Sequence, residues 1–338
     1  MRTVAVVAGG PSSEHQVSCW SGRRVFESLD RRRYRPLYVE IGRDGSWSID
    51  GVRRGGPLEG VRSLKEQGCA VAFLALHGPF GEDGTIQGFL EAAGLSYTGS
   101  GVAGSAVAMD KVWTKRVVAA VGIPVAPDLV VPPDDAARAG AVLGWPVFVK
   151  RPRGGSSLEV RRADDEAALA VALSEVAGPG PLLLEAAVRG RELTVAVLDD
   201  EAGRPRALPV AAKRARGGVF DFANKYTPGM AEEIVPAPID PAVAERVRSL
   251  GLLAHETLGL KGMSRSDFIL REDGTACFLE INTIPGLTPT SLLPQAAAAA
   301  GIAFPDVLTR LVEGALRGAP APAPAERALP PAPVPTAR

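Results

Sequence analysis

Strand-like and helix-like segments alternate along most of this chain, and the alternation favours an α/β fold built in layers. Residues 3–8, 35–41 and 70–76 are short apolar runs typical of buried strands, and we expect a helix to begin near Glu14. A polar or glycine-rich turn follows each strand at its carboxyl end, where open α/β sheets bind ligands. The first hundred residues therefore predict an open parallel α/β domain with a ligand site at the carboxyl ends of its strands.

The chain after residue 105 divides into two further units and a tail. Strand-like runs at residues 145–150, 182–185 and 193–198, with a helix opening at residues 109–115, predict a small α+β unit. The remainder carries a hairpin and a final helix at residues 304–316, and the last twenty residues are rich in proline and alanine, as in a disordered or extended tail. We place the units at residues 1–105, 106–198, 199–318 and 319–338.

The hairpin is the sharpest local prediction. Residues 268–270 and 276–279 are short apolar runs joined by residues 271–275, which contain an Asp-Gly pair. Asp-Gly between two such runs is typical of a hairpin turn. Pairing of the two strands would place Asp267 beside Glu280.

The residue types at this hairpin suit phosphate and hard-cation chemistry. Asp267, Glu280 and Asn282 offer the oxygen donors that Mg²⁺ takes in octahedral sites. Arg265 lies two residues before Asp267 and so points to the same face, where a guanidinium can meet a phosphate or an oxyanion. The alternative is a solvated edge strand with ordinary salt bridges.

A second cluster follows the strand that ends at Lys150. Residues 151–157 are rich in Gly, Ser and Arg, and exposed backbone N–H groups and hydroxyls in such a loop can cradle phosphate beside Lys150. The lysine precedes the glycines, so the order of a P-loop is absent. A plain flexible hairpin loop remains the alternative.

Composition narrows the class of partner. Lys plus Arg and Asp plus Glu are balanced at 38 each, which argues against nucleic acid or an anionic membrane and leaves a small molecule as the expected partner. The three cysteines, an odd number spaced far apart, argue against a disulfide framework. No run has the length of a membrane span or of a signal sequence. We therefore expect a cytoplasmic protein.

From about residue 3 to residue 318 the chain resembles the D-alanine–D-alanine ligases of the ATP-grasp superfamily. The resemblance depends on several motifs in the expected order. They are GGPSSEHQVS at 9–18, ALHGPFGEDGTIQG at 75–88, YTGSG at 97–101 with MDK at 109–111, FANKY at 222–226, EINTIPGLT at 280–288 and SLLP at 291–294.

The resemblance implies a three-domain ATP-grasp fold, with an N-terminal α/β domain and an α+β central unit, and it implies a role for each matched residue. Nucleotide contacts would come from Lys111, Lys150, Ser156, Glu185, Val188, Glu192 and Lys225. Two Mg²⁺ ions, or Mn²⁺, would be held by Asp267, Glu280 and Asn282. Amino acid substrates would meet Glu14, His77, Ser291 and Leu292, and the catalytic set would be Glu14, Ser156, Tyr226, Arg265 and Gly286.

The implied reaction joins two D-alanines with ATP, through an acyl phosphate, to supply peptidoglycan precursors. Arg265 and the Gly286 N–H would stabilise the oxyanion, and Glu14, Ser156 and Tyr226 would hydrogen-bond across the cleft. Tyr226 favours an amine over a hydroxyl as the nucleophile. A homodimer is also implied.

The chain departs from the family pattern at two places. In the phosphate loop Arg151 stands in a proline slot, Gly154 replaces Glu, and Glu159 lies near the expected phosphate. In the adenine hinge Ala186 and Ala187 replace a Lys and a bulky residue. Two other classes stay open: an ATP-grasp ligase for a different amino acid pair, and a non-catalytic nucleotide-binding relative.

Overall fold

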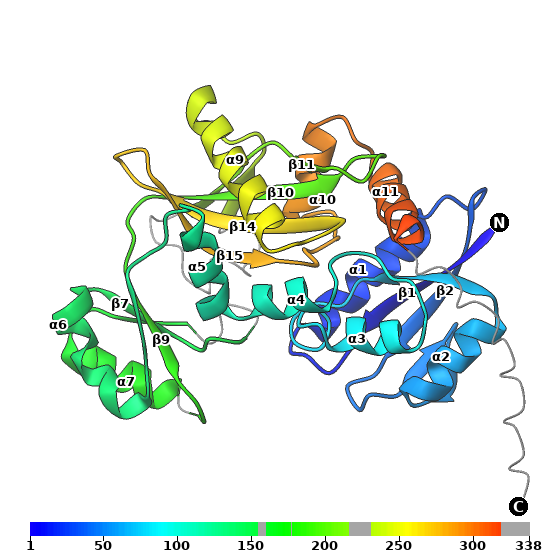
Figure 1. The fold of residues 1–338 in the computed structure, drawn as a ribbon, viewed down its shortest axis with the longest axis horizontal. Helices are drawn as coiled ribbons and strands as arrows, with labels where there is room; N and C mark the ends of the chain where they lie inside the picture. The colour runs from blue at the N-terminus through cyan, green and yellow to red at the C-terminus, as the bar shows by residue number, and fades with distance from the viewer. Residues whose placement is uncertain (155–159, 177, 216–230, 319–338) are drawn as a thin grey trace, which may run out of the picture.

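The computed structural model describes residues 1–154, 160–176, 178–215 and 231–318, and within them the strands form three sheets (Figure 1). Helices and strands are mixed throughout, so the α/β class is confirmed. The expected roles of Ser156, Lys225 and Tyr226, and the expected tail at 319–338, lie outside the described residues.

The first sheet has the order β4-β3-β2-β1-β5. Its strands are β1 (Arg2–Gly9), β2 (Tyr34–Ile41), β3 (Trp47–Ile49), β4 (Val52–Gly55) and β5 (Cys69–Leu74), and its helices include α1 (His15–Ser28), α2 (Pro57–Glu66) and α3 (Thr85–Ala92). Strands β2, β1 and β5 are parallel, as predicted, while β3 and β4 add an antiparallel edge. Residues Val4 to Ala8 of β1 are fully buried, which explains their continuous apolar run.

The central sheet is antiparallel, in the order β6-β9-β7-β8. It contains β6 (Asp128–Val131), β7 (Val147–Lys150), β8 (Arg161–Ala163) and β9 (Leu182–Ala186), with a 3-10 turn (Pro133–Arg138), α6 (Ala139–Leu143) and α7 (Glu166–Glu175). Inward-facing Val147, Val149, Leu182 and Leu184 form its core with Leu169 of α7. This unit has its own small core, as expected for a separate α+β layer.

The third sheet runs β13-β12-β10-β14-β15, with β11 beside β10. Its strands are β10 (Arg191–Asp199), β11 (Pro205–Ala207), β12 (Ala211–Ala215), β13 (Ala231–Ile234), β14 (Met263–Leu270) and β15 (Ala276–Asn282). Its helices are α9 (Pro241–Thr257), α10 (Leu292–Ala299) and α11 (Phe304–Arg317), and α4 (Val102–Met109) and α5 (Lys111–Ala120) lead into it from the first domain.

Strand β10 was expected in the central unit and lies instead in the third sheet. It pairs with β14 along eight residue pairs, from Arg191 to Leu198. One of its faces joins the core under α9, where Gly251 closely approaches Val195. The other face joins the core formed with α10 and α11. Sheet membership therefore favours a boundary between β9 and β10 over the expected one after residue 198.

The first domain and the third sheet share a single apolar core. Val307 and Leu308 of α11 pack in the same cluster as β1 and β5, and the Tyr34 hydroxyl donates to Glu313 at 2.6 Å. Burial of a continuous apolar surface fixes these two parts against each other. The carboxyl ends of the parallel strands of the first sheet, where the ligand site is expected, thus face the end of β15.

Among the described helices none is long and apolar enough by itself to cross a membrane, although α10 and α11, bent by 105°, together satisfy the criteria of length and composition.

Candidate active site

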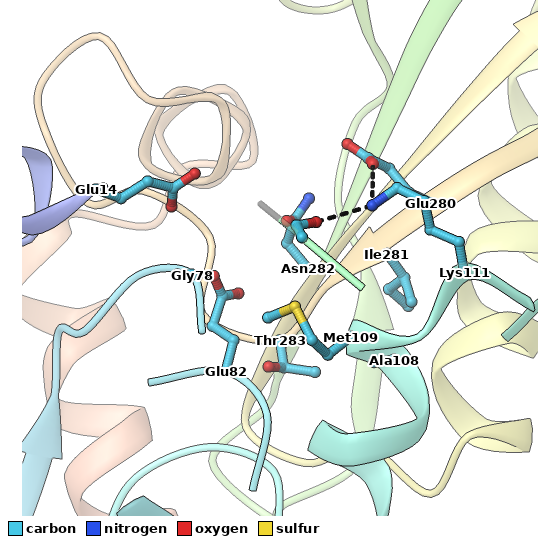
Figure 2. Close-up of a pocket in the computed structure, with 11 residues that line it drawn as sticks. Glu14, Gly78, Glu82, Ala108, Met109, Lys111, Glu280, Ile281, Asn282 and Thr283 are labelled. Carbon is cyan, nitrogen blue, oxygen red and sulfur yellow. Dashed lines mark hydrogen bonds and ion pairs between the residues drawn. The ribbon is translucent and has the colours of Figure 1, made fainter. Parts of the chain in front are cut away.

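A polar pocket lies where the first domain, the α4–α5 connection and the end of β15 meet (Figure 2). Figure 2 shows Glu14 on one side and Lys111 with Glu280 on the other. The pocket is lined by Glu14, Gly78, Glu82, Ala108, Met109, Lys111, Gly154, Glu280, Ile281, Asn282 and Thr283. Residues from positions 14 to 283 converge here, so the site exists only in the folded chain.

The predicted hairpin is confirmed at the back of this pocket. Asp267 of β14 pairs directly with Glu280 of β15, and Arg265 pairs with Asn282. The Arg265 Nη2 lies 2.9 Å from Asp267 Oδ2, and the Thr194 hydroxyl donates to Asp267 Oδ1 at 2.7 Å. Burial alone would raise the pKa of Asp267, but Arg265 and Lys213 hold it well below its usual range. The carboxylate is therefore charged, and a cation stands beside it.

Lys111 bridges two parts of the pocket. Its Nζ donates to the Gly154 carbonyl at 2.9 Å and lies 3.9 Å from Glu280 Oε2 (Figure 2). Asp110 caps α5 by accepting from the N–H groups of Val112 and Trp113, so Lys111 is the first residue of that helix. The helix start aims this ammonium across the pocket toward the hairpin.

Lys150 contacts a buried charge cluster that sequence reasoning missed. Its Nζ makes a short ion pair with Glu185, whose other carboxylate oxygen lies 2.5 Å from Lys115 Nζ. Lys115 is 1% exposed and also lies 3.2 Å from Asp128. Burial would raise the pKa of Glu185, but Lys150 and Lys115 together lower it to about 2. Glu185 thus holds two lysines in place through its side chain.

Glu192 has a comparable partner on the neighbouring strand. Lys213 of β12 lies 2.5 Å from Glu192 and 3.6 Å from Asp267. Lys213 therefore connects the position expected to meet ribose with the expected metal ligands.

Val188, the expected hinge residue, lies half-buried between β9 and β10. In the same hinge, the N–H groups of Ala186 and Ala187 donate to the carbonyls of Pro127 and Pro146.

His77 has both ring nitrogens engaged. Nδ1 lies 2.9 Å from the Ile284 carbonyl, which can only accept, so Nδ1 carries the proton and Nε2 accepts from the Ser21 hydroxyl at 2.8 Å. Burial lowers the pKa of His77 to about 4. His77 is thus a neutral bridge from the first domain to the segment after β15.

Glu82 anchors the same segment and was also missed. Its two carboxylate oxygens accept from the N–H groups of Gly78 and Ile284, each at 2.8 Å. Burial raises the pKa of Glu82 to about 7, with a smaller contribution from Glu14. For Glu14 itself burial is the main cause of a raised pKa, and Arg265 opposes it. The pocket therefore places two carboxyl groups in a shielded setting.

The turn expected to bind the second substrate is compact. A Cβ on Gly286 would lie 2.6 Å from Ser291 Oγ, so this position accommodates glycine best. Ser291 Oγ accepts from the Thr288 N–H at 3.1 Å and lies 2.7 Å from the Thr288 hydroxyl. Leu292 begins α10 directly after Ser291. The N-terminus of that helix faces this turn.

The donor set at the hairpin fits a hard divalent cation. Asp267, Glu280 and Asn282 supply oxygen atoms from one face of two paired strands. The Asn282 Nδ2 is buried and has no hydrogen-bond partner among the described residues, so this amide is not committed to the protein on that side. The Glu280 side chain is 38% exposed and reaches into the pocket.

The structure brings Glu14, Lys111, Glu280 and Asn282 into one pocket and places Arg265 and Asp267 directly behind it. Lys150 with Glu185 and Glu192 with Lys213 form two flanking ion pairs. Glu82 lies within the motif at residues 75–88, so that motif gave a signal for it. Nothing local in the sequence pointed to Lys115 or Lys213, because each acquires its role from a partner at least twenty residues away.

Comparison with known proteins gives a consistent result. The family model described as D-ala D-ala ligase C-terminus matches residues 117–313, and the model described as D-ala D-ala ligase N-terminus matches residues 3–57 and 54–100. A D-alanine–D-alanine ligase of Desulforudis audaxviator is 41% identical over 317 residues, covering 92% of this chain and 98% of the relative. That of Streptomyces avermitilis is 38% identical over 365 residues, covering 93% and 94%.

Solved structures agree. The D-alanine–D-alanine ligase from Bacillus anthracis superposes with a TM-score of 0.79 at 30% identity, covering 94% of this chain and 98% of that one. A D-Ala:D-Ser ligase from Enterococcus faecalis also gives a TM-score of 0.79, at 27% identity, with 92% and 98% covered.

Proposed function

The chain belongs to the D-alanine–D-alanine ligase family, and from that premise we propose how its own residues carry out the reaction. It is an ADP-forming ligase that joins two D-alanines for peptidoglycan precursor synthesis. The observation that carries the mechanism is the meeting of Glu14, Lys111 and the Arg265–Asn282 hairpin at one pocket.

ATP is the phosphoryl donor that the family implies. Lys111 and Lys150 contact its phosphates, and the Glu185 side chain positions Lys150. Support comes from the ion pair between Lys150 and Glu185, with Lys115 on the other carboxylate oxygen. The backbone from Glu185 to Val188 meets the base, and Glu192, paired with Lys213, meets the ribose.

Mg²⁺ held by Asp267, Glu280 and Asn282, with Mn²⁺ as a substitute, would neutralise phosphate charge during transfer. Arg265 contributes a fixed positive charge at the same face, because its guanidinium is held by Asp267. Glu280 stands between this face and Lys111, so a ligand binding at the pocket meets carboxylate and ammonium together.

The first step forms an acyl phosphate. Glu14 holds the ammonium of the first D-alanine, whose carboxylate oxygen attacks the γ-phosphorus while the bond from that phosphorus to the ADP oxygen breaks. The pocket position of Glu14, opposite Lys111 and Glu280, supports this placement (Figure 2). Closure of the site excludes water that would hydrolyse the intermediate.

The second step forms the peptide bond. The amine of the second D-alanine, after losing its extra proton, attacks the acyl carbon, and the carbon–oxygen bond to phosphate then breaks with release of inorganic phosphate. Arg265 and the Gly286 N–H stabilise the oxyanion. Ser291 and the Leu292 N–H bind the second carboxylate, which the N-terminus of α10 favours.

His77 is a positioning residue in this scheme. Its ring nitrogens are both engaged, one with Ser21 and one with Ile284, so it acts on substrate through the segment that carries Gly286. Ser156, Lys225 and Tyr226 lie outside the described residues. Their roles in ATP binding and closure stay proposals from the resemblance.

We also propose a homodimer, from family resemblance, and a cytoplasmic location. The location is supported by the use of ATP as substrate and by Cys19, Cys69 and Cys277 being free thiols. Sedimentation of the purified protein tests the dimer.

The direct test of function is ADP release with ATP, Mg²⁺ and D-alanine, with the product identified by mass. Release with D-alanine alone and formation of D-alanyl-D-alanine is the expected result. L-alanine serves as the control for the first site, and D-serine and D-lactate as alternative second substrates. ADP release only with D-serine as the second substrate would reassign the acceptor, and no ADP release with any pair would overturn the proposed mechanism.

A further inference from the structure

Three potential metal ligands gather where the start of α1 meets the end of β2 in the first domain. A ring nitrogen of His15, the Cys19 Sγ and a carboxylate oxygen of Glu40 all lie within 4.8 Å of one another. His15 and Cys19 are four residues apart on α1 and so share one helix face. Glu40 stands near the carboxyl end of β2, the strand beside β1. None of the three belongs to the pocket described above.

The hydrogen bond of His15 prepares the ring for a ligand. Nδ1 lies 2.7 Å from the Gly10 carbonyl, and a carbonyl can only accept, so Nδ1 carries the proton. The lone pair of the neutral ring is then on Nε2. A metal-bound histidine typically donates its other ring N–H to a carbonyl or carboxylate in this way, which fixes the tautomer and the ring orientation.

The spacing suits a small cation after a modest adjustment. Zinc bonds of about 2.0 to 2.3 Å in a tetrahedron place ligand atoms about 3.3 to 3.8 Å apart. The present separations of up to 4.8 Å require closure by roughly 1 Å. Glu40 is exposed and Cys19 is only half-buried, so both side chains have room to move. Water would take the fourth position.

The chemistry of the three donors selects the type of ion. Thiolate and imidazole together favour Zn²⁺ and related ions over Mg²⁺ and Ca²⁺, which prefer oxygen alone.

Two arginine side chains lie near the Cys19 thiol, but both are held by other groups. The Arg43 guanidinium donates to the Ser12 carbonyl at 3.0 Å, and Arg23 lies 4.6 Å above the Tyr38 ring. Burial, followed by Glu40, raises the pKa of the Cys19 thiol, so binding would release its proton.

We propose that His15, Cys19 and Glu40 form a binding site for a thiophilic divalent cation of the zinc class, separate from the catalytic pocket. The site is built from the first two turns of α1 and the end of β2. His15 directly follows Glu14 in the chain, so Zn²⁺ at this site has to be distinguished from Zn²⁺ in the catalytic pocket.

Cobalt titration tests the site, because Co²⁺ occupies zinc sites and gives a sulfur-to-cobalt charge-transfer band when a thiolate is a ligand. The full-length protein should give this band at one equivalent, with Mg²⁺ and ADP in excess to fill the catalytic pocket. Zn²⁺ should abolish the band by competition. Cys19→Ser should remove it, and His15→Gln and Glu40→Gln should each weaken Co²⁺ binding by at least about tenfold.

Two matched variants separate this site from the alternatives. Cys69→Ser changes another partly buried thiol, whose Sγ contacts the Val71 carbonyl, and should leave the band unchanged. Glu280→Gln alters the catalytic pocket and should also leave it unchanged. A band that survives Cys19→Ser, or one that is lost in either control, would overturn the proposal.

A measurement on the unaltered protein guards against variants that fail to fold. Zn²⁺ should slow alkylation of Cys19, followed peptide by peptide by mass spectrometry, while the rate at Cys69 stays constant. Equal rates at Cys19 with and without saturating Zn²⁺, together with no cobalt band, would refute the site.

Discussion

Glu185→Gln is the sharpest perturbation that the structure offers, because one buried carboxylate neutralises two lysines. Glu185 is 4% exposed and lies between Lys115 and Lys150. Glutamine keeps the shape and removes the charge. In the variant Lys115 would keep its ion pair with Asp128 at 3.2 Å. Lys150 would lose the ion pair that it makes with Glu185.

The lowered pKa of Glu185 gives the size of the stability loss expected in the variant. Lowering the pKa of Glu185 from 4.5 to about 2 corresponds to about 3 kcal/mol of stability at neutral pH, at about 1.4 kcal/mol per pKa unit. That value agrees with the roughly 3 to 5 kcal/mol expected when one partner of a buried ion pair is removed. Because the folded pKa is depressed, the contribution is present above pH 4.5 and is lost as the pH falls toward 2.

Hydrogen exchange of the β7 and β9 amides is the appropriate assay, since it reports on the central unit rather than on a multidomain average. At pH 7 the variant should exchange about a hundredfold faster at these amides, the equivalent of about 3 kcal/mol. The control is Glu175→Gln in the same unit. Glu175 is 49% exposed and pairs with Arg161 at the surface. Removing its charge should therefore lower the stability by less than about 1 kcal/mol. Equal protection of the Glu185→Gln variant and the parent protein would refute the reasoning.

Three further predictions concern the catalytic pocket. Glu280→Gln should abolish ADP release, because it removes a proposed metal ligand, while Glu272→Gln in the exposed hairpin turn should leave the rate unchanged; near-normal turnover of the first variant would contradict the assignment. The pKa of Glu82 is raised to about 7, so its contribution to stability is present below pH 4.5 and lost as the pH rises through 7. The urea midpoint of the parent protein should therefore fall more steeply between pH 4.5 and pH 7 than the midpoint of Glu82→Gln. Parallel plots of midpoint against pH for the two proteins would contradict this role of Glu82. Tyr226→Phe should shift the product ratio toward the D-lactate ester when D-alanine and D-lactate compete, and an unchanged ratio would leave Tyr226 with a packing role.

Local rules predicted the hairpin, because turn chemistry and strand alternation act over a few residues. The pairing of Asp267 with Glu280 followed from the two short apolar runs and the Asp-Gly turn between them. Strand β10 was expected within the central unit, whereas it pairs with β14 of the third sheet, since a buried apolar strand does not encode its neighbour. Its partner, β14, lies about seventy residues further along the chain.

Large separations in sequence also explain why the ion pairs of Lys115 and Lys213 could not be predicted. Lys115 meets Glu185 across seventy residues, and Lys213 meets Asp267 across more than fifty. A lysine in a helix or a strand has no local mark that separates burial from exposure. Only the tertiary fold could assign these two residues to the site.

The position of the proposed oxyanion donor depends on the first domain, although Gly286 belongs to the segment after β15. Glu82 accepts from the Ile284 N–H, and His77 donates to the Ile284 carbonyl. On the other side of Gly286, the Ser21 hydroxyl accepts from the Leu287 N–H at 3.3 Å, and Arg24 donates to the Leu287 carbonyl at 2.7 Å.

These four bonds fix the backbone on both sides of the glycine before any substrate arrives. A donor contributes most to catalysis when it is already oriented, because no reorganisation is then required as charge develops. The first domain therefore has two functions that the sequence pattern alone did not separate. In the proposed mechanism Glu14 holds the first substrate directly, while Ser21, Arg24, His77 and Glu82 hold the turn on which the second chemical step depends.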